Sequence, residues 1–200
     1  MKLKIKYPRI KLLSFRVRQA VGRSSGCITT QRRCATKRSY RFLDIKRKLK
    51  PKVTAHIVAK YIYDPNRTAR ISIIMYDNSL SCYILASNYH DKQETVGNLL
   101  NSKFKRYTGF SNFLRRLNSG TIIHNIELTP GHGDRLVRSA GNSAVLLTKD
   151  RRSKKNYLLK LRSGEYRFIK RNLIAFVGVV SNHAHFLKRL KKAGSTRHKG

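Results

Sequence analysis

The sequence predicts a mainly β protein built from small antiparallel barrels, with extended basic tails. Short segments rich in Ile, Val, Tyr and Phe recur along the chain, and turn signals such as Asp64-Pro65-Asn66 and Asp77-Asn78 separate them. Clusters of Lys and Arg lie between these segments and at both ends of the chain. Many short strands at regular spacing are typical of small barrels rather than of parallel α/β layers.

The predicted strands fall into two series. The first series comprises Ser39–Ile45, Val53–Tyr63, Ala69–Tyr76 and Leu80–Ala86. The second comprises Thr121–Leu128, Ser143–Thr148, Asn156–Leu161, Glu165–Ile169 and Leu173–Val180. The polar region between them is weakly periodic, and only Asn112–Leu117 suggests a helical turn. We therefore divide the chain into a basic arm (1–37), a first barrel (38–88), a junction (89–119), a second barrel (120–182) and a basic extension (183–200).

Net charge is the strongest indication of function. The chain has 45 Lys and Arg residues against 9 Asp and Glu residues, a formal net charge of +36 over 200 residues. Like charges at this density repel one another across a compact surface, so the chain is expected to bind a polyanion such as nucleic acid. No apolar run approaches the ~20 residues that a membrane span needs. The three cysteines are too few for a disulfide scaffold and indicate a reducing compartment.

The first 43 residues contain no Asp or Glu. Such a segment has two interpretations, a mitochondrial transit peptide or a basic arm that RNA neutralises. We favour the arm because the basic character continues past any plausible cleavage point.

Sequence motifs give little support to catalysis. No pair of carboxylates has a spacing that favours acid–base chemistry, and neither a Walker-type loop nor a GxSxG elbow is present. Cys27 and Cys34 are too far apart for an ordinary structural zinc site, and His183 with His185 is a short pair without further ligands. We assign no catalytic residue, no metal and no cofactor, and treat these as ordinary thiols and as surface or RNA-facing imidazoles.

Three local patterns are candidates for RNA contact. The segment Pro130–Asp134 contains two glycines. They either form a plain turn or allow the backbone to come close to a phosphate. The flanking Arg135 and Arg138 favour the second interpretation, contact with RNA. The turn at Asp64-Pro65-Asn66 is expected to point Arg67 and Arg70 outward.

Tyr40 and Phe42 flank Arg41 in the third pattern. They form either a base-stacking platform or, more commonly for such a strand, an inward face with the cation pointing outward.

The predicted RNA-binding residues are cations of the basic clusters together with the glycine-rich turn and its flanks. They are Arg32, Arg33, Lys37, Arg38, Arg41, Lys46, Arg47, Arg67, Arg70, Gly131, Gly133, Arg135, Arg138, Ser139, Arg162, Arg167, Arg171, Lys188, Arg189, Lys191, Lys192, Arg197, His198 and Lys199.

Several segments, in order and in register over most of residues 22–200, resemble the ribosomal large-subunit protein two (L2) family. They are Gly26–Thr30, Tyr40–Arg47, Tyr61–Arg67, Tyr83–Ala86, Gly120–Leu128, Arg138–Gly141, Leu161–Glu165, Lys192–Gly194 and Arg197–Gly200. The resemblance implies an OB-fold RNA-binding barrel followed by an SH3-like barrel, with tails that penetrate large-subunit rRNA. It also implies a role in subunit association, tRNA binding and support of the peptidyl-transferase region, where RNA is the catalyst. The implied partners are large-subunit rRNA and other ribosomal proteins.

Two departures from the family stand out. The region 88–119 lacks the expected connector that contains Gly and Pro. The sequence also ends at Gly200, where the family continues into a stretch with a Pro-His-Gly-Gly-Gly motif. That stretch is either lost or supplied by a separate chain, and we favour the separate chain. These departures, together with richness in Lys, Asn, Ile and Tyr, lead us to expect a mitochondrial ribosome.

Two other function classes fit the charge. A free-standing RNA-binding assembly factor explains the charge but not the ordered series of family segments. An RNA-modifying enzyme is disfavoured because the sequence shows no nucleophile, cofactor loop or metal cluster.

Overall fold

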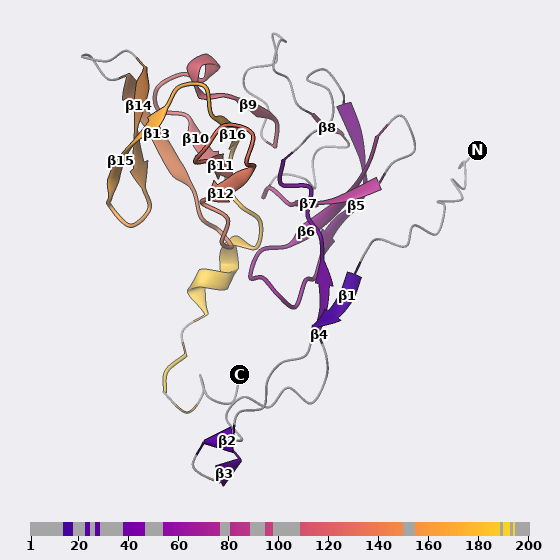
Figure 1. Cartoon of the computed structure of the whole chain (residues 1–200). Coiled ribbons are helices and arrows are strands. Elements are labelled where there is room, and N and C mark those ends of the chain that lie inside the picture. Colours follow the sequence, from indigo (N-terminus) through magenta and orange to yellow (C-terminus); the bar gives the residue numbers. More distant parts are fainter. Residues whose placement is uncertain are drawn as a thin grey trace.

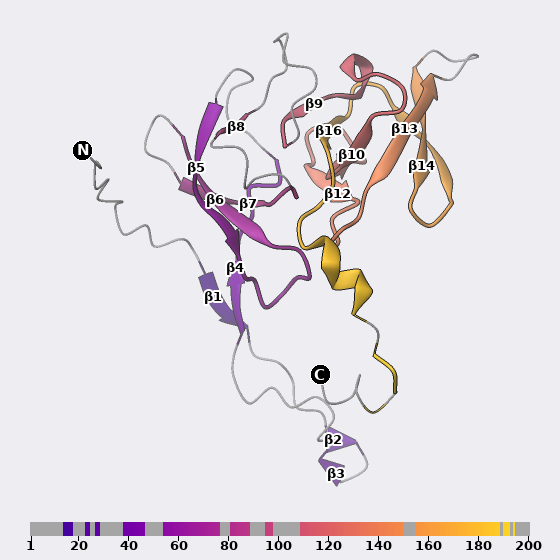
Figure 2. The ribbon, with the colours of Figure 1, turned by 180° about the vertical axis from the view of Figure 1, so that it is seen from behind.

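The computed structural model describes residues 14–17, 23–24, 27–28, 38–46, 54–76, 81–88, 95–97, 109–149, 155–188, 190–192 and 194. The architecture is mainly β, as predicted, and consistent with an OB-fold barrel followed by an SH3-like barrel. The two β bodies lie side by side in both views of the ribbon (Figures 1 and 2). Within the described residues, no helix has the length and apolarity needed to cross a membrane.

The N-terminal body is built on a four-stranded antiparallel sheet with the order β7-β6-β5-β8. Its strands are β5 (Thr54–Ile62), β6 (Ile71–Tyr76), β7 (Ser81–Leu85) and β8 (Thr95–Gly97). On β6, Ile71, Ile74 and Tyr76 are buried, and Ile74 and Tyr76 pack with Ala55 and Ile84 as one core. Burying each large apolar side chain stabilises this sheet by about 1.5–3 kcal/mol.

Two small ribbons precede this sheet. β1 (Ser14–Val17) pairs with β4 (Arg38–Arg41), and β2 (Arg23–Ser24) pairs with β3 (Cys27–Ile28). A parallel bridge between Leu43 and Tyr83 joins the segment after β4 to the main sheet. This bridge attaches the segment that follows β4 to strand β7 of the main sheet.

The C-terminal body contains a six-stranded sheet with the order β15-β14-β13-β10-β16-β9. The strands are β9 (Ser111–Phe113), β10 (Ile122–His124), β13 (Ala144–Lys149), β14 (Asn156–Leu161), β15 (Tyr166–Lys170) and β16 (Ile174–Val177). A smaller pair, β11 (Ile126–Glu127) and β12 (Asp134–Leu136), lies beside it. Leu114, Ile123, Leu146, Tyr157 and Leu159 are fully buried in the core of this body.

Each segment predicted as a strand overlaps at least one observed strand, and the expected helical turn at Asn112–Leu117 contains the 3-10 helix η3 (Leu114–Arg116). The predicted strand Thr121–Leu128 is split into β10 and β11 at Asn125, whose φ of 48° interrupts extended backbone. A second 3-10 helix, η4 (His183–Leu187), follows the last strand.

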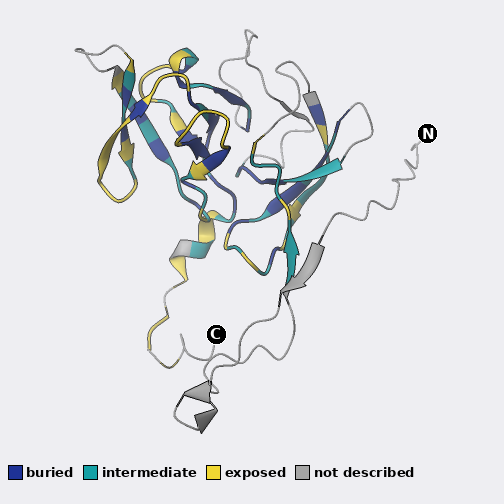
Figure 3. Ribbon diagram, viewed as in Figure 1, coloured by how far each residue is buried: buried dark blue, intermediate teal, exposed yellow. Residues whose placement is uncertain are grey.

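Two short strands lie within the predicted junction, residues 89–119. β8 pairs with β5 of the N-terminal sheet, and β9 pairs with β16 of the C-terminal sheet. Each spans only three residues, which is too short for a periodic hydrophobic pattern. Figure 3 shows how burial concentrates inside the two bodies, whereas the loop tips are exposed.

Candidate RNA interface

A hydrogen-bonded seam joins the two bodies. The buried Ser181 accepts a hydrogen bond from the Arg70 amide through Oγ (3.1 Å), donates through Oγ to the Arg70 carbonyl (3.3 Å), and donates its own amide to the Ala86 carbonyl (3.0 Å). The Asn88 amide donates to the Val179 carbonyl at 2.9 Å. These hydrogen bonds link residues that directly precede or follow strands of the two bodies, so the seam helps to set how the two bodies are placed.

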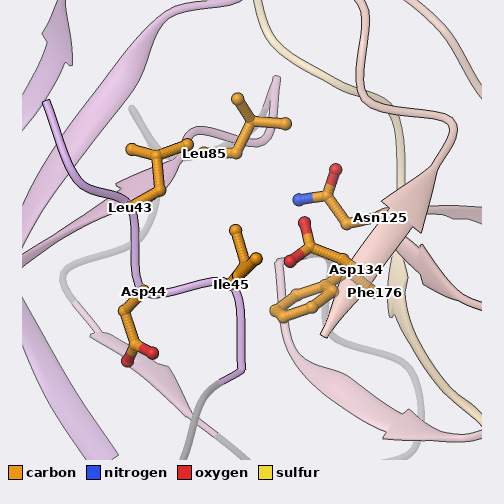
Figure 4. Close-up of a pocket in the computed structure, with 7 residues that line it drawn as sticks. All are labelled: Leu43, Asp44, Ile45, Leu85, Asn125, Asp134 and Phe176. Carbon is orange, nitrogen blue, oxygen red and sulfur yellow. The ribbon is translucent and has the colours of Figure 1, made fainter. Parts of the chain in front are cut away.

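The second part of the seam is a close approach at the glycine-rich loop. The Asp134 amide donates to the Ile45 carbonyl at 3.2 Å, and Gly133 is buried next to it. A Cβ on Gly133 would lie 2.8 Å from the Ile45 carbonyl oxygen, closer than real Cβ atoms approach. Figure 4 shows Ile45 facing Asn125 and Asp134 across this seam, where the remaining cavity is about 10 Å³. That volume holds at most about one water molecule, so the bodies are tightly packed here.

Apolar and buried polar contacts complete the seam. Ala69, Leu85 and Val180 form a buried cluster that joins both bodies. Ser87 Oγ lies 3.0 Å from Nε2 of the fully buried His124. The seam therefore contains both a buried apolar cluster and a buried polar contact, and it is separate from the cores of the two bodies.

A groove of about 460 Å³ opens along this seam. Its walls come from both bodies: one wall carries Arg67, and the other carries Arg138 and Ser139. Tyr40, Asn66, Thr68 and Leu85 line the rest. A groove with an arginine on each wall is suited to a phosphate-bearing ligand, since guanidinium groups bind phosphate through several donors at once.

On the N-terminal side, a buried carboxylate holds two of the arginines. The Asp64 side chain is fully buried and pairs with Nε of Arg67 and, at 3.5 Å, with Nη1 of Arg41. Its Oδ1 also accepts the Asn66 amide at 3.0 Å, which closes the predicted turn. The expectation that this turn points Arg67 outward is wrong in detail, since its side chain is only 17% exposed and lies against Asp64.

On the C-terminal side, Arg138 follows Val137, which has a φ of 57°. The Ala140 amide donates to Thr68 Oγ1 at 3.2 Å, and the Asn182 side-chain amide donates to the Thr68 carbonyl at 2.7 Å. Arg138 Nε lies 3.8 Å from Oδ2 of Asp134, and its side chain is 32% exposed. The turn that carries Arg138 is thus tied across the seam to the N-terminal body.

Tyr40 and Phe42 do not form the inward-facing aromatic face that is more common for such a strand. Tyr40 and Phe42 contact each other edge to face at 5.3 Å, Phe42 is exposed, and Tyr40 lines the groove. Arg41 instead turns toward the buried Asp64. An inward aromatic face with an outward cation is therefore wrong for this segment.

The two candidate glycines lie in different environments. Gly131 is exposed with open space around it, so its backbone is accessible to a ligand. Gly133 is covered by Ile45, and its amide donates to Glu127 Oε1 at 3.3 Å. The structure thus gives Gly133 a packing contact between the two bodies.

The remaining predicted residues are spread over the surface. Arg162 donates to the Gly141 carbonyl at 2.8 Å, Arg167 pairs with Glu165 at 3.0 Å, and Arg70 joins the seam through its backbone. Exposed positions are taken by Lys46, Arg135, Arg171, Lys188, Lys191 and Lys192. Arg38 lies in β4, where only its backbone is described. Outside the described residues lie Arg32, Arg33, Lys37, Arg47, Arg189, Arg197, His198 and Lys199.

Sequence reasoning missed two further arrangements. Arg115 and Arg116 lie over the ring of Phe113, 5.1 Å and 5.9 Å from its centroid. Tyr166 and Phe168 are exposed on β15. The sequence could have indicated this pair, because two aromatic residues two positions apart on a strand share one face.

Among the described residues, no group of three or more His, Cys, Asp or Glu side chains is placed to hold a metal ion.

Comparison with known families agrees with this architecture. The model of the ribosomal protein L2 RNA-binding N-terminal domain matches residues 10–97, and that of the L2 C-terminal domain matches residues 108–200. The chain belongs to the ribosomal protein L2 family. It is also 40% identical over 198 residues to the large ribosomal subunit protein uL2 of Mycoplasmoides gallisepticum, a match that covers 96% of this chain and 68% of the relative.

The family match agrees with the two bodies of the structure. The N-terminal match ends at the last residue of β8, and the C-terminal match begins just before β9. The groove lies between the two matched domains and has arginines from both.

Proposed function

We propose that this chain is a structural component of the large ribosomal subunit that binds rRNA through the groove between its two barrels. The observation that carries this proposal is the placement of Arg67 and Arg138 on opposite walls of one groove. Asp64 fixes the first arginine, and the seam fixes the turn that carries the second. Rigid cations on both walls hold a phosphate backbone in one register, which is what a structural rRNA contact requires.

The binding mechanism is electrostatic and geometric. Each cation that neutralises a phosphate releases counterions, so affinity falls as salt rises. If about ten cations contact phosphate, the slope of log affinity against log salt is roughly −7 to −9. The net charge of +36 supplies the cations, and the two barrels fix the spacing of the contacts.

Membership of the L2 family supports a more specific role. We propose that the chain supports subunit association, tRNA binding and the peptidyl-transferase region, with large-subunit rRNA and other ribosomal proteins as partners. It is proposed not to be an enzyme, because peptide-bond chemistry in this setting belongs to RNA.

We also propose that the ribosome concerned is mitochondrial. The richness in Lys, Asn, Ile and Tyr supports this, whereas the relative described above is bacterial. Fractionation of the source cells tests the proposal: recovery of the chain with mitochondrial ribosomes supports it, and recovery only with ribosomes outside that organelle contradicts it.

A binding titration tests the groove. The full chain is titrated with in vitro transcribed large-subunit rRNA over a range of salt concentrations, beside the variants Arg138→Ala and Lys155→Ala. Both variants remove one cation, but Arg138 is a half-buried residue of the groove, whereas Lys155 is exposed outside it. We expect Arg138→Ala to weaken binding more and to reduce the salt slope by about 0.7–0.9. Equal effects of the two variants would refute the role of the groove.

A further inference from the structure

The hairpin formed by β14 and β15 carries two exposed aromatic side chains on one face. Tyr166 is 57% exposed and Phe168 is 61% exposed, whereas Ile169 is buried in the core. Since side chains alternate along a strand, Tyr166 and Phe168 share the face that points away from the core. Within the described residues β15 is the edge of its sheet, on the side of the C-terminal body away from the N-terminal body (Figures 1 and 2).

The neighbouring strand adds a cation to this face. In the strand register, Lys160 lies opposite Tyr166 and the half-buried Leu158 lies opposite Phe168. The Lys160 ammonium lies 5.8 Å from the centroid of the Tyr166 ring. Lys170, two residues beyond Phe168, shares the same face and is exposed. Two rings and two ammonium groups thus form one surface, which we call the hairpin platform (Tyr166, Phe168, Lys160 and Lys170).

Charge around the platform favours a polyanion. Residues 155–171 contain six Lys and Arg residues and one acid, Glu165. That carboxylate is paired with Arg167 at 3.0 Å. Isolated exposed hydrophobic side chains are common on protein surfaces and need no explanation. Two exposed rings with cations beside them are a less common arrangement. RNA has both features that this surface complements, negative charge and flat aromatic bases.

We propose that the hairpin platform binds unpaired nucleotides of RNA, with bases stacked on Tyr166 and Phe168 and phosphates near Lys160 and Lys170. Unpaired nucleotides are required because bases inside a duplex are already stacked and hide their faces. The inference rests on the proposed rRNA-binding function, but the platform is separate from the groove, none of whose lining residues it contains.

Three double variants of the full chain test the platform. Tyr166→Ala with Phe168→Ala removes both rings, and Tyr166→Leu with Phe168→Leu keeps apolar bulk without a ring. Tyr166→Phe with Phe168→Tyr keeps both rings and is the matched control. All three change exposed positions, and denaturant unfolding curves establish that each variant folds. The probe is in vitro transcribed large-subunit rRNA.

We expect the Ala and Leu variants to bind the rRNA about tenfold or more weakly, because stacking of a base on an aromatic side chain contributes substantially to affinity. The ring-exchange control should bind like the natural chain. Ultraviolet cross-linking followed by mass spectrometry should find nucleotide adducts on Tyr166 or Phe168, at bases that are unpaired in the rRNA.

Other results would overturn the proposal in distinguishable ways. If the natural chain binds the rRNA but the Leu variant binds equally well, base stacking is absent. If the Ala variant keeps its rRNA affinity but loses a ribosomal protein from reconstituted particles, the platform is a protein interface. If the natural chain does not bind the rRNA at all, and Arg138→Ala changes nothing, the proposed function itself fails.

Discussion

Replacing Gly133 by alanine tests the close contact between the two barrels. Gly133 has a φ of 85°, and an added Cβ would lie 2.8 Å from the Ile45 carbonyl oxygen and 3.0 Å from its carbonyl carbon. Both atoms belong to backbone, so the contact cannot be relieved by rotating a side chain. The Ile45 carbonyl also accepts the Asp134 amide, which leaves the segment little freedom to withdraw.

The expected magnitude has two parts. A non-glycine residue in left-handed backbone costs about 1 kcal/mol, and overpacking a fixed contact costs about 1–3 kcal/mol more. Gly133→Ala should therefore reduce the free energy of unfolding by about 2–4 kcal/mol. Gly131→Ala is the matched control, because Gly131 has a similar φ of 75° with open space around it. Only the strain of about 1 kcal/mol applies to that variant.

Urea unfolding, with thermal unfolding as a second assay, compares the two variants. For a chain of this size, each kcal/mol shifts Tm by about 2–4 °C. The melting temperature of Gly133→Ala should therefore lie about 6 °C below that of Gly131→Ala. Equal losses of stability in the two variants would refute the reasoning, because they would show that Ile45 does not constrain position 133.

Three further changes test the seam and the groove. Asp64→Asn removes the charge that holds Arg67, and should destabilise the fold by roughly 3 kcal/mol in urea unfolding; a loss below about 0.5 kcal/mol would show that the pair is not coupled. Ser181→Ala removes both hydrogen bonds to the Arg70 backbone and should lower the free energy of unfolding by about 1–3 kcal/mol. The control Ser163→Ala changes an exposed serine and should lower it by less than about 0.5 kcal/mol. Similar losses in the two variants would contradict the account. Combining Arg67→Ala with Arg138→Ala should reduce the salt slope of rRNA binding by about 1.4–1.8, and an unchanged slope would show that neither cation contacts phosphate.

The strands were predictable because their residues carry a local signal. On β6 the burial of Ile71, Ile74 and Tyr76 follows from a run of large apolar residues that the sequence places between two turn signals. β9 and β8 were not predictable, because three residues give no measurable periodicity and their pairing partners are distant in sequence.

The candidate site was only partly predictable for the same reason. The sequence marks Arg67 as a cation in a turn, but its orientation depends on the buried Asp64, which also pairs with the distant Arg41. The sequence likewise marks Gly133 as a turn residue, whereas its contact with Ile45 exists only after two separate barrels pack together. Which cations share a groove is a property of the seam, and no local pattern encodes it.

The most direct test of the central claim is the stoichiometry of this chain in ribosomal particles. Lysate of the source cells is separated on a sucrose gradient at moderate salt, and quantitative mass spectrometry measures the chain in each fraction. A structural component should migrate with mature large subunits at about one copy per particle and remain there as salt is raised moderately, since many phosphate contacts hold it. Recovery only in free or precursor fractions would contradict the account and would identify the chain as an assembly factor.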